Sequence, residues 1–269
     1  MSIARYLLSL VEGPLKERAI KRLASQQPQH PFNRENWGRS LTDPTGAYED
    51  AVRHFYHALP QPLRDHRVYF YGTPGKRRGF GEHAFHTLWN GLLNDIKPKS
   101  FLEIGVFRGQ VISLVALWAK INGQALQVCG ISPFSEAGDA VSKYQGGLDY
   151  HEDTLKNFAH FQLPVPELVK AYSTDPGAKA RIDSQTWDLI YIDGNHDYDV
   201  ARQDWEVCSR AVRPGGLIVL DDSGLSTSYQ PPRFASRGHP GPSKLATEID
   251  RKKFVEVLQV GHNRVFEKH

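Results

Sequence analysis

The chain has 269 residues, of which 40% are hydrophobic and 23% are charged, and its formal net charge is +3. These values lie near the averages of globular proteins and exclude a disordered tail, a collagen-like repeat and a disulfide-rich miniprotein. Cys129 and Cys208 are the 2 cysteines, too few for a disulfide framework or a four-thiolate zinc site. We therefore expect buried thiols in a reducing compartment.

The sequence shows no sign of membrane insertion or export. No apolar run approaches the roughly 18 residues of a membrane span, and the first residues lack a basic segment followed by a cleavable apolar core. We expect a cytoplasmic protein without stable membrane insertion. The mild positive charge suits an anionic ligand, but no long Lys/Arg run indicates nucleic-acid binding. A homo-oligomer is compatible with the sequence.

Residues 1–81 are predicted to form a mainly helical N-terminal extension with a packing, oligomer or lid role. Apolar residues recur at helical spacing from Ile3 to Leu23, with basic residues between them. This pattern favours a helix packed on the main domain or on a second subunit, and a peripheral membrane anchor is the alternative. A second helix is expected over about 45–59, and a short strand over 67–71.

From about residue 82, apolar strand-like runs alternate with helical segments. This alternation predicts an α/β domain with a Rossmann-like, mostly parallel sheet of about seven strands, covered by helices on both faces. The last two strands are joined by a short turn and must pair as an antiparallel hairpin. The strands are expected at 99–104, 126–131, 167–171, 187–193, 216–221, 254–260 and 264–267, and the helices at 111–121, 176–183, 200–212 and 243–252.

The first predicted strand ends in a glycine-rich turn with the pattern E-x-G-x-x-x-G, formed by Glu103, Gly105 and Gly109. Glycines permit a tight turn and a close backbone approach to a ligand. The helix that follows offers free N–H groups at its start. The spacing differs from the G-x-G-x-x-G of dinucleotide-binding proteins.

Carboxylate side chains follow the fourth and fifth predicted strands, and the chemistry is expected to depend on them. The fourth strand leads into D-G-N-H with Asp193 and His196, and the fifth ends with Asp221 and Asp222. These carboxylates should converge, and oxygen ligands suit Mg²⁺. A bound dication lowers the pKa of a coordinated hydroxyl. His196 is the candidate general base, because histidine titrates near neutral pH.

Structural interpretations of the same residues stay open. The aspartate after the fourth strand can line a pocket without a metal, and Asp222 can stabilise a turn. His196 can orient a substrate instead of accepting its proton.

The motifs W-D-L-I-Y-I-D-G-N-H and P-G-G-L-I-V-L-D-D together resemble the class I S-adenosylmethionine-dependent methyltransferases. Within them, they look like the small-molecule O-methyltransferases of the methyltransferase 24 family. The resemblance covers about 82–269 and implies a cofactor-binding domain that methylates a hydroxyl of a sugar or secondary metabolite. It implies that the cofactor is bound by Glu103, Gly105, Val106, Phe107, Gly109, Ser132 and Asp193. A valine at Gly105 is then expected to block the cofactor without unfolding the chain.

One position departs from the family pattern. The acid that would bind the cofactor ribose after the second strand is absent, and Ile131 is followed by Ser132 and Pro133. Ser132 can make one ribose hydrogen bond, and Asp139 in the next loop is a candidate replacement.

A long loop over 223–243 follows the two aspartates at the expected active face. Loops of this length are usually functional or disordered. We interpret it as a substrate lid, with an oligomer contact or an ordinary surface loop as the alternatives. Its aromatic side chains can stack on a ring and its arginines can bind an anion. The candidate substrate contacts are Tyr229, Arg233 and Arg237, with Phe234 and His239 beside them.

Two other functional classes remain as alternatives. A non-catalytic ligand-binding or assembly protein is compatible with the same fold, because fold does not fix function. A nucleotide-dependent oxidoreductase is disfavoured by the missing G-x-G-x-x-G pattern.

Overall fold

The computed structural model describes residues 18–72, 78–136, 138–139, 141–142, 144–232 and 235–269. Its centre is one seven-stranded sheet in the order β3-β2-β1-β4-β5-β7-β6. The first five strands in this order pair in parallel, and β7 pairs antiparallel with both β5 and β6. The strands are β1 (Ser100–Ile104), β2 (Gln127–Ser132), β3 (Glu167–Lys170), β4 (Trp187–Ile192), β5 (Val212–Leu220), β6 (Phe254–Val260) and β7 (Asn263–Lys268).

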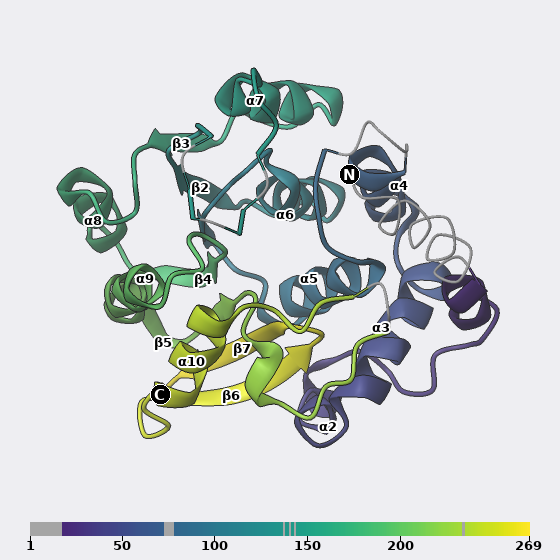
Figure 1. Ribbon diagram of the computed structural model, residues 1–269. Coiled ribbons are helices and arrows are strands. Elements are labelled where there is room, and N and C mark those ends of the chain that lie inside the picture. The colour runs from purple at the N-terminus through teal and green to yellow at the C-terminus, as the bar shows by residue number, and fades with distance from the viewer. Residues whose placement is uncertain (1–17, 73–77, 137, 140, 143, 233–234) are drawn as a thin grey trace, which may run out of the picture.

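Helices cover both faces of this sheet (Figure 1). The described helices are η1 (Arg34–Asn36), α2 (Arg39–Thr42), α3 (Pro44–His57), α4 (Gln61–Tyr71), α5 (His83–Ile96), α6 (Gln110–Ile121), α7 (Tyr150–His160), α8 (Pro176–Asp183), α9 (Tyr198–Ala211), η2 (Gly224–Ser226) and α10 (Pro240–Glu248). Helices α3, α5 and α6 pack on one face, and α8, α9 and α10 pack on the other. The predicted Rossmann-like architecture and its C-terminal hairpin are confirmed.

Alternation along the central strands builds a core on each face. In β4, Leu189 and Tyr191 join the core beneath α5 and α6, while Ile190 and Ile192 join the core beneath α9. Successive side chains of a strand point to opposite faces, so a strand buried on both sides must be apolar almost throughout. This is why the central strands were visible in the sequence as continuous apolar runs.

The predicted strand over 67–71 is wrong, because these residues form the end of helix α4. The buried face of that helix consists of Leu63, His66, Arg67 and Phe70, which follow i, i+3, i+4, i+7 spacing. Two of the four are polar, so the spacing of the hydrophobic residues alone does not indicate a helix. Helix α3 matches its prediction, with Asp43 accepting a hydrogen bond from the Gly46 N–H at its start.

Helices α5 and α7 were not predicted. Helix α5 carries a glycine in its middle, Gly91, where an added Cβ would lie 2.4 Å from the Phe32 ring. The glycine therefore permits a close contact that only the folded chain reveals. The helix predicted from Ile3 lies outside the described residues up to residue 17. Within the described part of the chain, no helix has the length and apolar character needed to cross a bilayer.

Candidate active site

A cavity of about 920 Å³ lies where the parallel strands end. Binding sites for small molecules usually measure about 300–1,000 Å³. The strand order reverses between β1 and β4, and open α/β sheets bind ligands at this point. The cavity walls come from the ends of β1, β2, β4 and β5, from helix α5 and from residues 79–82. The space is large enough for a nucleoside cofactor together with an acceptor.

The glycine turn after β1 allows the ends of β1 and β4 to pack closely. Gly105 has φ +92°, and a Cβ added there would lie 1.9 Å from the Asp193 carbonyl oxygen. The expectation for a valine at Gly105 is therefore corrected, since its side chain would strike the β4 loop before it reached a ligand. Gly109, with φ +78°, closes the turn against Thr154 and does not line the cavity.

Glu103 lies at the inner end of this turn and lines the cavity. It is 2% exposed, and its Oε2 finds no hydrogen-bond partner among the described residues. Burial raises the pKa of Glu103 well above its ordinary value, and nearby Asp221 adds to this, although the Ile112 N–H acts in the opposite direction. Such a carboxyl is a candidate partner for a cationic group of a ligand.

The other predicted cofactor residues also face this space. Val106, Phe107 and Ser132 all line the cavity. The Phe107 ring lies 5.1 Å from the exposed Phe80 ring, between centroids, so aromatic side chains gather on this side. Asp139 does not line the cavity, because its carboxylate is used elsewhere. Of the two candidates for the ribose contact, only Ser132 is in a position to make it.

The three predicted aspartates do come together at the ends of β4 and β5. Asp193, Asp221 and Asp222 all line the cavity. The Tyr191 hydroxyl donates to Asp193 Oδ2 at 3.1 Å. Burial raises the pKa of Asp193 well above its ordinary value, and the neighbouring Asp221 raises it further. Asp193 therefore holds a proton more readily than a carboxylate in water does.

His196 is held between two carboxylates. Its Nδ1 lies 2.6 Å from Asp139 Oδ2, and its Nε2 lies 2.8 Å from Asp222 Oδ2. Burial lowers the pKa of His196, but the bonds to Asp222 and Asp139 outweigh it and raise the value to about 9. An imidazole with both nitrogens bonded and a proton already bound is a poor general base. The geometry thus favours an orienting role for His196 over the predicted proton acceptor.

Two further histidines approach the same aspartates. His262, in the β6–β7 turn, has its Nε2 3.3 Å from Asp221 Oδ1 and 3.8 Å from Asp222 Oδ1. His239, in the loop before α10, has its Nε2 3.9 Å from Asp222 Oδ2. Gly238 lets this loop pass closely, since a Cβ there would lie 2.2 Å from the Asp222 carbonyl oxygen.

The candidate ligand atoms form two close groups among the described residues, each within 4.8 Å. One group is Asp221, Asp222 and His262, and the other is His196, Asp222 and His239. Asp193 belongs to neither, although it was predicted as a ligand. Burial raises the pKa of Asp222, but the bond from His196 and the charges of His262 and His239 outweigh it, so the net shift is downward.

The long loop after β5 supplies fewer cavity contacts than predicted. Tyr229 is fully buried and packs on Tyr48 at 5.4 Å between ring centroids, away from the cavity. Arg237 donates to the carbonyls of Leu225 and Thr227 and stabilises the loop itself. Arg233 and Phe234 lie outside the described residues. Among the described residues of this loop, Ser236 and His239 line the cavity.

The comparisons with known proteins agree with this geometry. The model of a methyltransferase domain family, methyltransferase 24, matches residues 102–223, which run from the middle of β1 to just beyond β5 and contain the three aspartates. The chain therefore contains a methyltransferase domain over these residues. The chain is 28% identical over 176 residues to an uncharacterised protein of Acanthamoeba polyphaga mimivirus, and the match covers 63% of this chain and 70% of that protein.

A second relative has a named activity. The demethylmacrocin O-methyltransferase of Streptomyces fradiae is 30% identical to this methyltransferase over 118 residues. The match covers 43% of this chain but only 29% of that protein. The likeness is thus confined to a segment of the longer enzyme.

Solved structures share the fold of this methyltransferase. The methyltransferase PaMTH1 of Podospora anserina, bound to SAH, aligns with TM-score 0.55 and 14% identity, covering 89% of this chain and 98% of that one. The O-methyltransferase of Bacillus cereus in complex with SAH aligns with TM-score 0.52 and 14% identity, covering 87% and 98%.

The wall of the cavity opposite the strand ends was not predicted from the sequence. Phe85 and Trp89 of α5 line it, one helical turn apart, and this spacing could have revealed the helix. Segment 79–82 completes this wall. Buried Arg67 of α4 fixes it by donating to the carbonyls of Phe80 and Gly81 at 3.2 and 2.7 Å.

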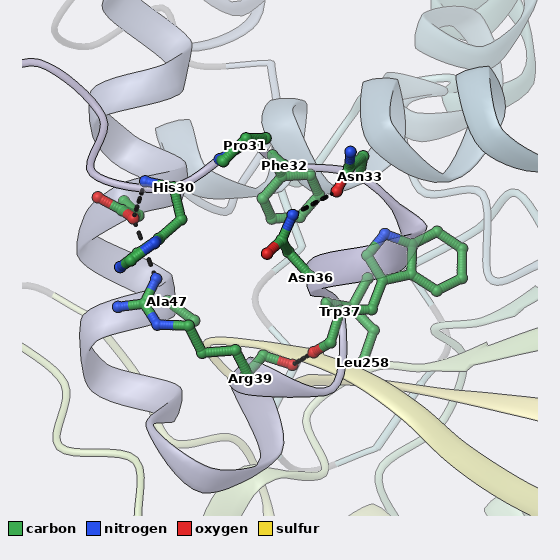
Figure 2. A pocket seen from close by; sticks show the side chains of 11 residues that line it. His30, Pro31, Phe32, Asn33, Asn36, Trp37, Arg39, Ala47 and Leu258 are labelled. Atoms are coloured by element: carbon green, nitrogen blue, oxygen red, sulfur yellow. Dashed lines mark hydrogen bonds and ion pairs between the residues drawn. The ribbon is translucent and has the colours of Figure 1, made fainter.

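A second cavity of the methyltransferase lies near η1 and α2, far smaller than the first, at about 30 Å³. Figure 2 shows Phe32, Trp37 and Arg39 among the side chains around it. The buried Trp37 Nε1 finds no hydrogen-bond partner among the described residues. The volume suits one or two water molecules.

Proposed function

We propose that this methyltransferase transfers the methyl group of S-adenosylmethionine to a hydroxyl oxygen of a small molecule, a sugar or another secondary metabolite. The observation that carries the proposal is the shared cavity, which has the glycine turn on one side and Asp193, Asp221 and Asp222 on the other. The named activity of the Streptomyces fradiae relative supports an oxygen acceptor.

The residues around the β1 turn fit the cofactor. The Glu103 carboxyl is buried, lines the cavity and has an oxygen without a described hydrogen-bond partner, so it suits the ammonium group of the methionine moiety. Val106 and Phe107 would pack beside that moiety, and Ser132 would bond the ribose. Gly105 and Gly109 contribute by shaping the turn.

The reaction requires the acceptor to lose its proton. S-adenosylmethionine, when bound, supplies an electrophilic methyl group, so a carbon–oxygen bond forms as the carbon–sulfur bond breaks. Asp193 is our candidate for the proton acceptor, because it lines the cavity and its pKa is raised by burial and by Asp221. A placed base typically contributes 10²–10⁴-fold.

A divalent metal at Asp221 and Asp222 would assist this step. Both carboxylates line the cavity, and the buried Asp221 Oδ1 finds no hydrogen-bond partner among the described residues. A cation bound there would lower the pKa of a nearby acceptor hydroxyl. His196 would hold Asp222 in place through its 2.8 Å bond.

Ligand-dependent melting tests the cofactor. S-adenosylhomocysteine at about 100 times its dissociation constant should add ~2.7 kcal/mol of stability and raise the melting temperature by roughly 5–10 °C. NAD should cause no shift. The absence of a shift with millimolar S-adenosylhomocysteine would exclude this cofactor. Methyl-labelled S-adenosylmethionine offered with a panel of hydroxylated sugars and metabolites then tests the acceptor class.

A further inference from the structure

Two buried histidines connect helices α4, α5 and α6 behind the wall of the cavity. His66 of α4 is fully buried, and its Nδ1 lies 3.1 Å from Nε2 of His86 in α5. The other ring nitrogen of His66, Nε2, lies 2.9 Å from Ser113 Oγ in α6. His86 is 1% exposed and lines the cavity. This chain of hydrogen bonds therefore begins in the core and ends at a residue of the cavity wall.

The serine determines which nitrogen of each ring carries a proton. Ser113 has one hydroxyl proton, which it donates to the Gln110 carbonyl oxygen at 3.2 Å. Its oxygen therefore accepts from His66 Nε2–H, and His66 Nδ1 is left as an acceptor. His86 donates to that atom from Nε2–H, so His86 Nδ1 carries a lone pair and no proton. Both rings are neutral, because burial lowers the pKa of His66 to about 3 and the pKa of His86 well below its ordinary value.

Two buried acceptor atoms of this cavity lack a protein partner. No residue in the described part of the chain bonds His86 Nδ1. Glu103 Oε2 is likewise buried without a described hydrogen-bond partner. Both side chains are held from the start of α6, because Glu103 accepts from the Ile112 N–H and His86 is held through His66 by Ser113. Buried acceptors of this kind require a ligand group that brings several N–H donors.

We propose that His86 Nδ1 accepts a hydrogen bond from the α-ammonium group of S-adenosylmethionine, beside the Glu103 carboxylate. An ammonium group has three donors and no acceptor, so a carboxylate and a neutral imidazole can bind it together. His66 and Ser113 are positioning residues, which keep His86 in the tautomer that accepts. This inference rests on the cofactor proposed above and adds a contact from α5, on the wall opposite the strand ends.

Analogues of the cofactor product separate this contact from the rest of the site. Binding of S-adenosylhomocysteine is compared by calorimetry with binding of its analogue without the α-amino group, and with methylthioadenosine, which lacks the whole amino-acid moiety. The wild-type chain should prefer S-adenosylhomocysteine to the deaminated analogue. His86→Phe should reduce this preference by about 10–100-fold, the range for a hydrogen bond to a charged group. Its affinity for methylthioadenosine should be nearly unchanged.

The positioning role of Ser113 has its own measurement. Long-range proton–nitrogen correlation spectra of the histidine side chains report which ring nitrogens are protonated. We expect His86 Nδ1 to be unprotonated in the wild-type chain. Ser113→Ala leaves His66 Nε2–H without an acceptor, so both tautomers should reverse and the preference for the amino group should fall by about tenfold or more. Ser40→Ala, at a buried serine outside the cavity, is the matched control and should change neither result.

The outcomes separate this inference from the proposed function. The inference is overturned if His86→Phe keeps the wild-type preference for the amino group while S-adenosylhomocysteine still binds, and the cofactor proposal then stands. It is also overturned if His86 Nδ1 carries a proton in the wild-type chain, because an N–H there would suit the cofactor carboxylate instead. If His86→Phe fails to fold, an unchanged preference in Ser113→Ala overturns it. Failure of the wild-type chain to bind either S-adenosylhomocysteine or methylthioadenosine would remove both proposals.

Discussion

His196 and Asp222 are joined by a 2.8 Å bond from Nε2 to Oδ2, while the opposite nitrogen of the same ring bonds Asp139. The ring thus links the loop after β2 to the end of β5. Two carboxylates stabilise the imidazolium form, which explains why the pKa of His196 is raised to about 9 despite burial. At neutral pH this side chain is a fixed positive charge.

This charge predicts a loss of stability in alkaline solution. Because the pKa of His196 is higher in the folded chain than its ordinary 6.5, its contribution is complete below about pH 6.5 and disappears as the pH rises through about 9. The loss should be on the order of 3 kcal/mol. Urea unfolding between pH 6.5 and 9.5 should show this slope, and His196→Gln should flatten it. An equally steep slope in the variant would show that other groups cause the effect.

Acid should destabilise the chain through a second histidine. His66 is fully buried and bonds Ser113 Oγ and His86. Burial lowers the pKa of His66 from 6.5 to about 3. Between these pH values the unfolded chain therefore binds a proton at this residue, and the folded chain does not. The contribution of His66 to stability is therefore complete above about pH 6.5 and falls as the pH drops toward 3, by up to about 5 kcal/mol. His66→Phe should weaken this dependence, and an unchanged dependence would contradict the assignment.

Gly105 should be required for folding rather than for cofactor space. An alanine there would place Cβ 1.9 Å from the Asp193 carbonyl oxygen and adopt φ +92°. We expect a loss of about 2–4 kcal/mol, measured by thermal and urea unfolding. Gly123→Ala is the matched control, because Gly123 also has a positive φ but open space around it. The control should lose only about 1 kcal/mol. Equal losses would show that the contact with Asp193 is unimportant.

Asp193 should control turnover and not cofactor affinity. Asp193→Asn removes the proposed proton acceptor while keeping its shape, so turnover should fall by about 10²–10⁴-fold. The melting shift with S-adenosylhomocysteine should be nearly unchanged. Asp199→Asn, at an exposed position on α9, serves as the control. Retention of full turnover in Asp193→Asn would assign the proton transfer to another group.

Sequence patterns predicted those parts of the molecule whose signals are local. Strands such as Trp187–Ile192 are buried on both faces and are visible as apolar runs. Asp193 follows this strand directly, and its position at the cavity could be predicted from the end of the run. Helix α4 was missed because His66 and Arg67 occupy its buried face. Polar residues on a buried face are recognised only when their partners are known.

The candidate site also contains residues that local patterns predict and residues that only the fold brings together. Asp221 and Asp222 follow a strand and could be predicted, but the β6–β7 turn that carries His262 is brought to them by the antiparallel pairing of β5 with β7. No spacing in the chain connects residue 262 with residue 221. Likewise, Tyr229 lies in a loop rich in turn formers, but it is buried against Tyr48, which belongs to α3.

The bonds from Arg67 to the carbonyls of Phe80 and Gly81 have a consequence for how acceptor choice can change. They attach one wall of the cavity to α4, whereas the opposite wall is formed by the strand ends. Segment 79–82 is thus held from α4, whereas Trp89 of α5 packs on Tyr191 of β4 at 4.9 Å between ring centroids. Substitutions in segment 79–82 should therefore change the shape of the cavity with less effect on the strand ends than substitutions of Trp89.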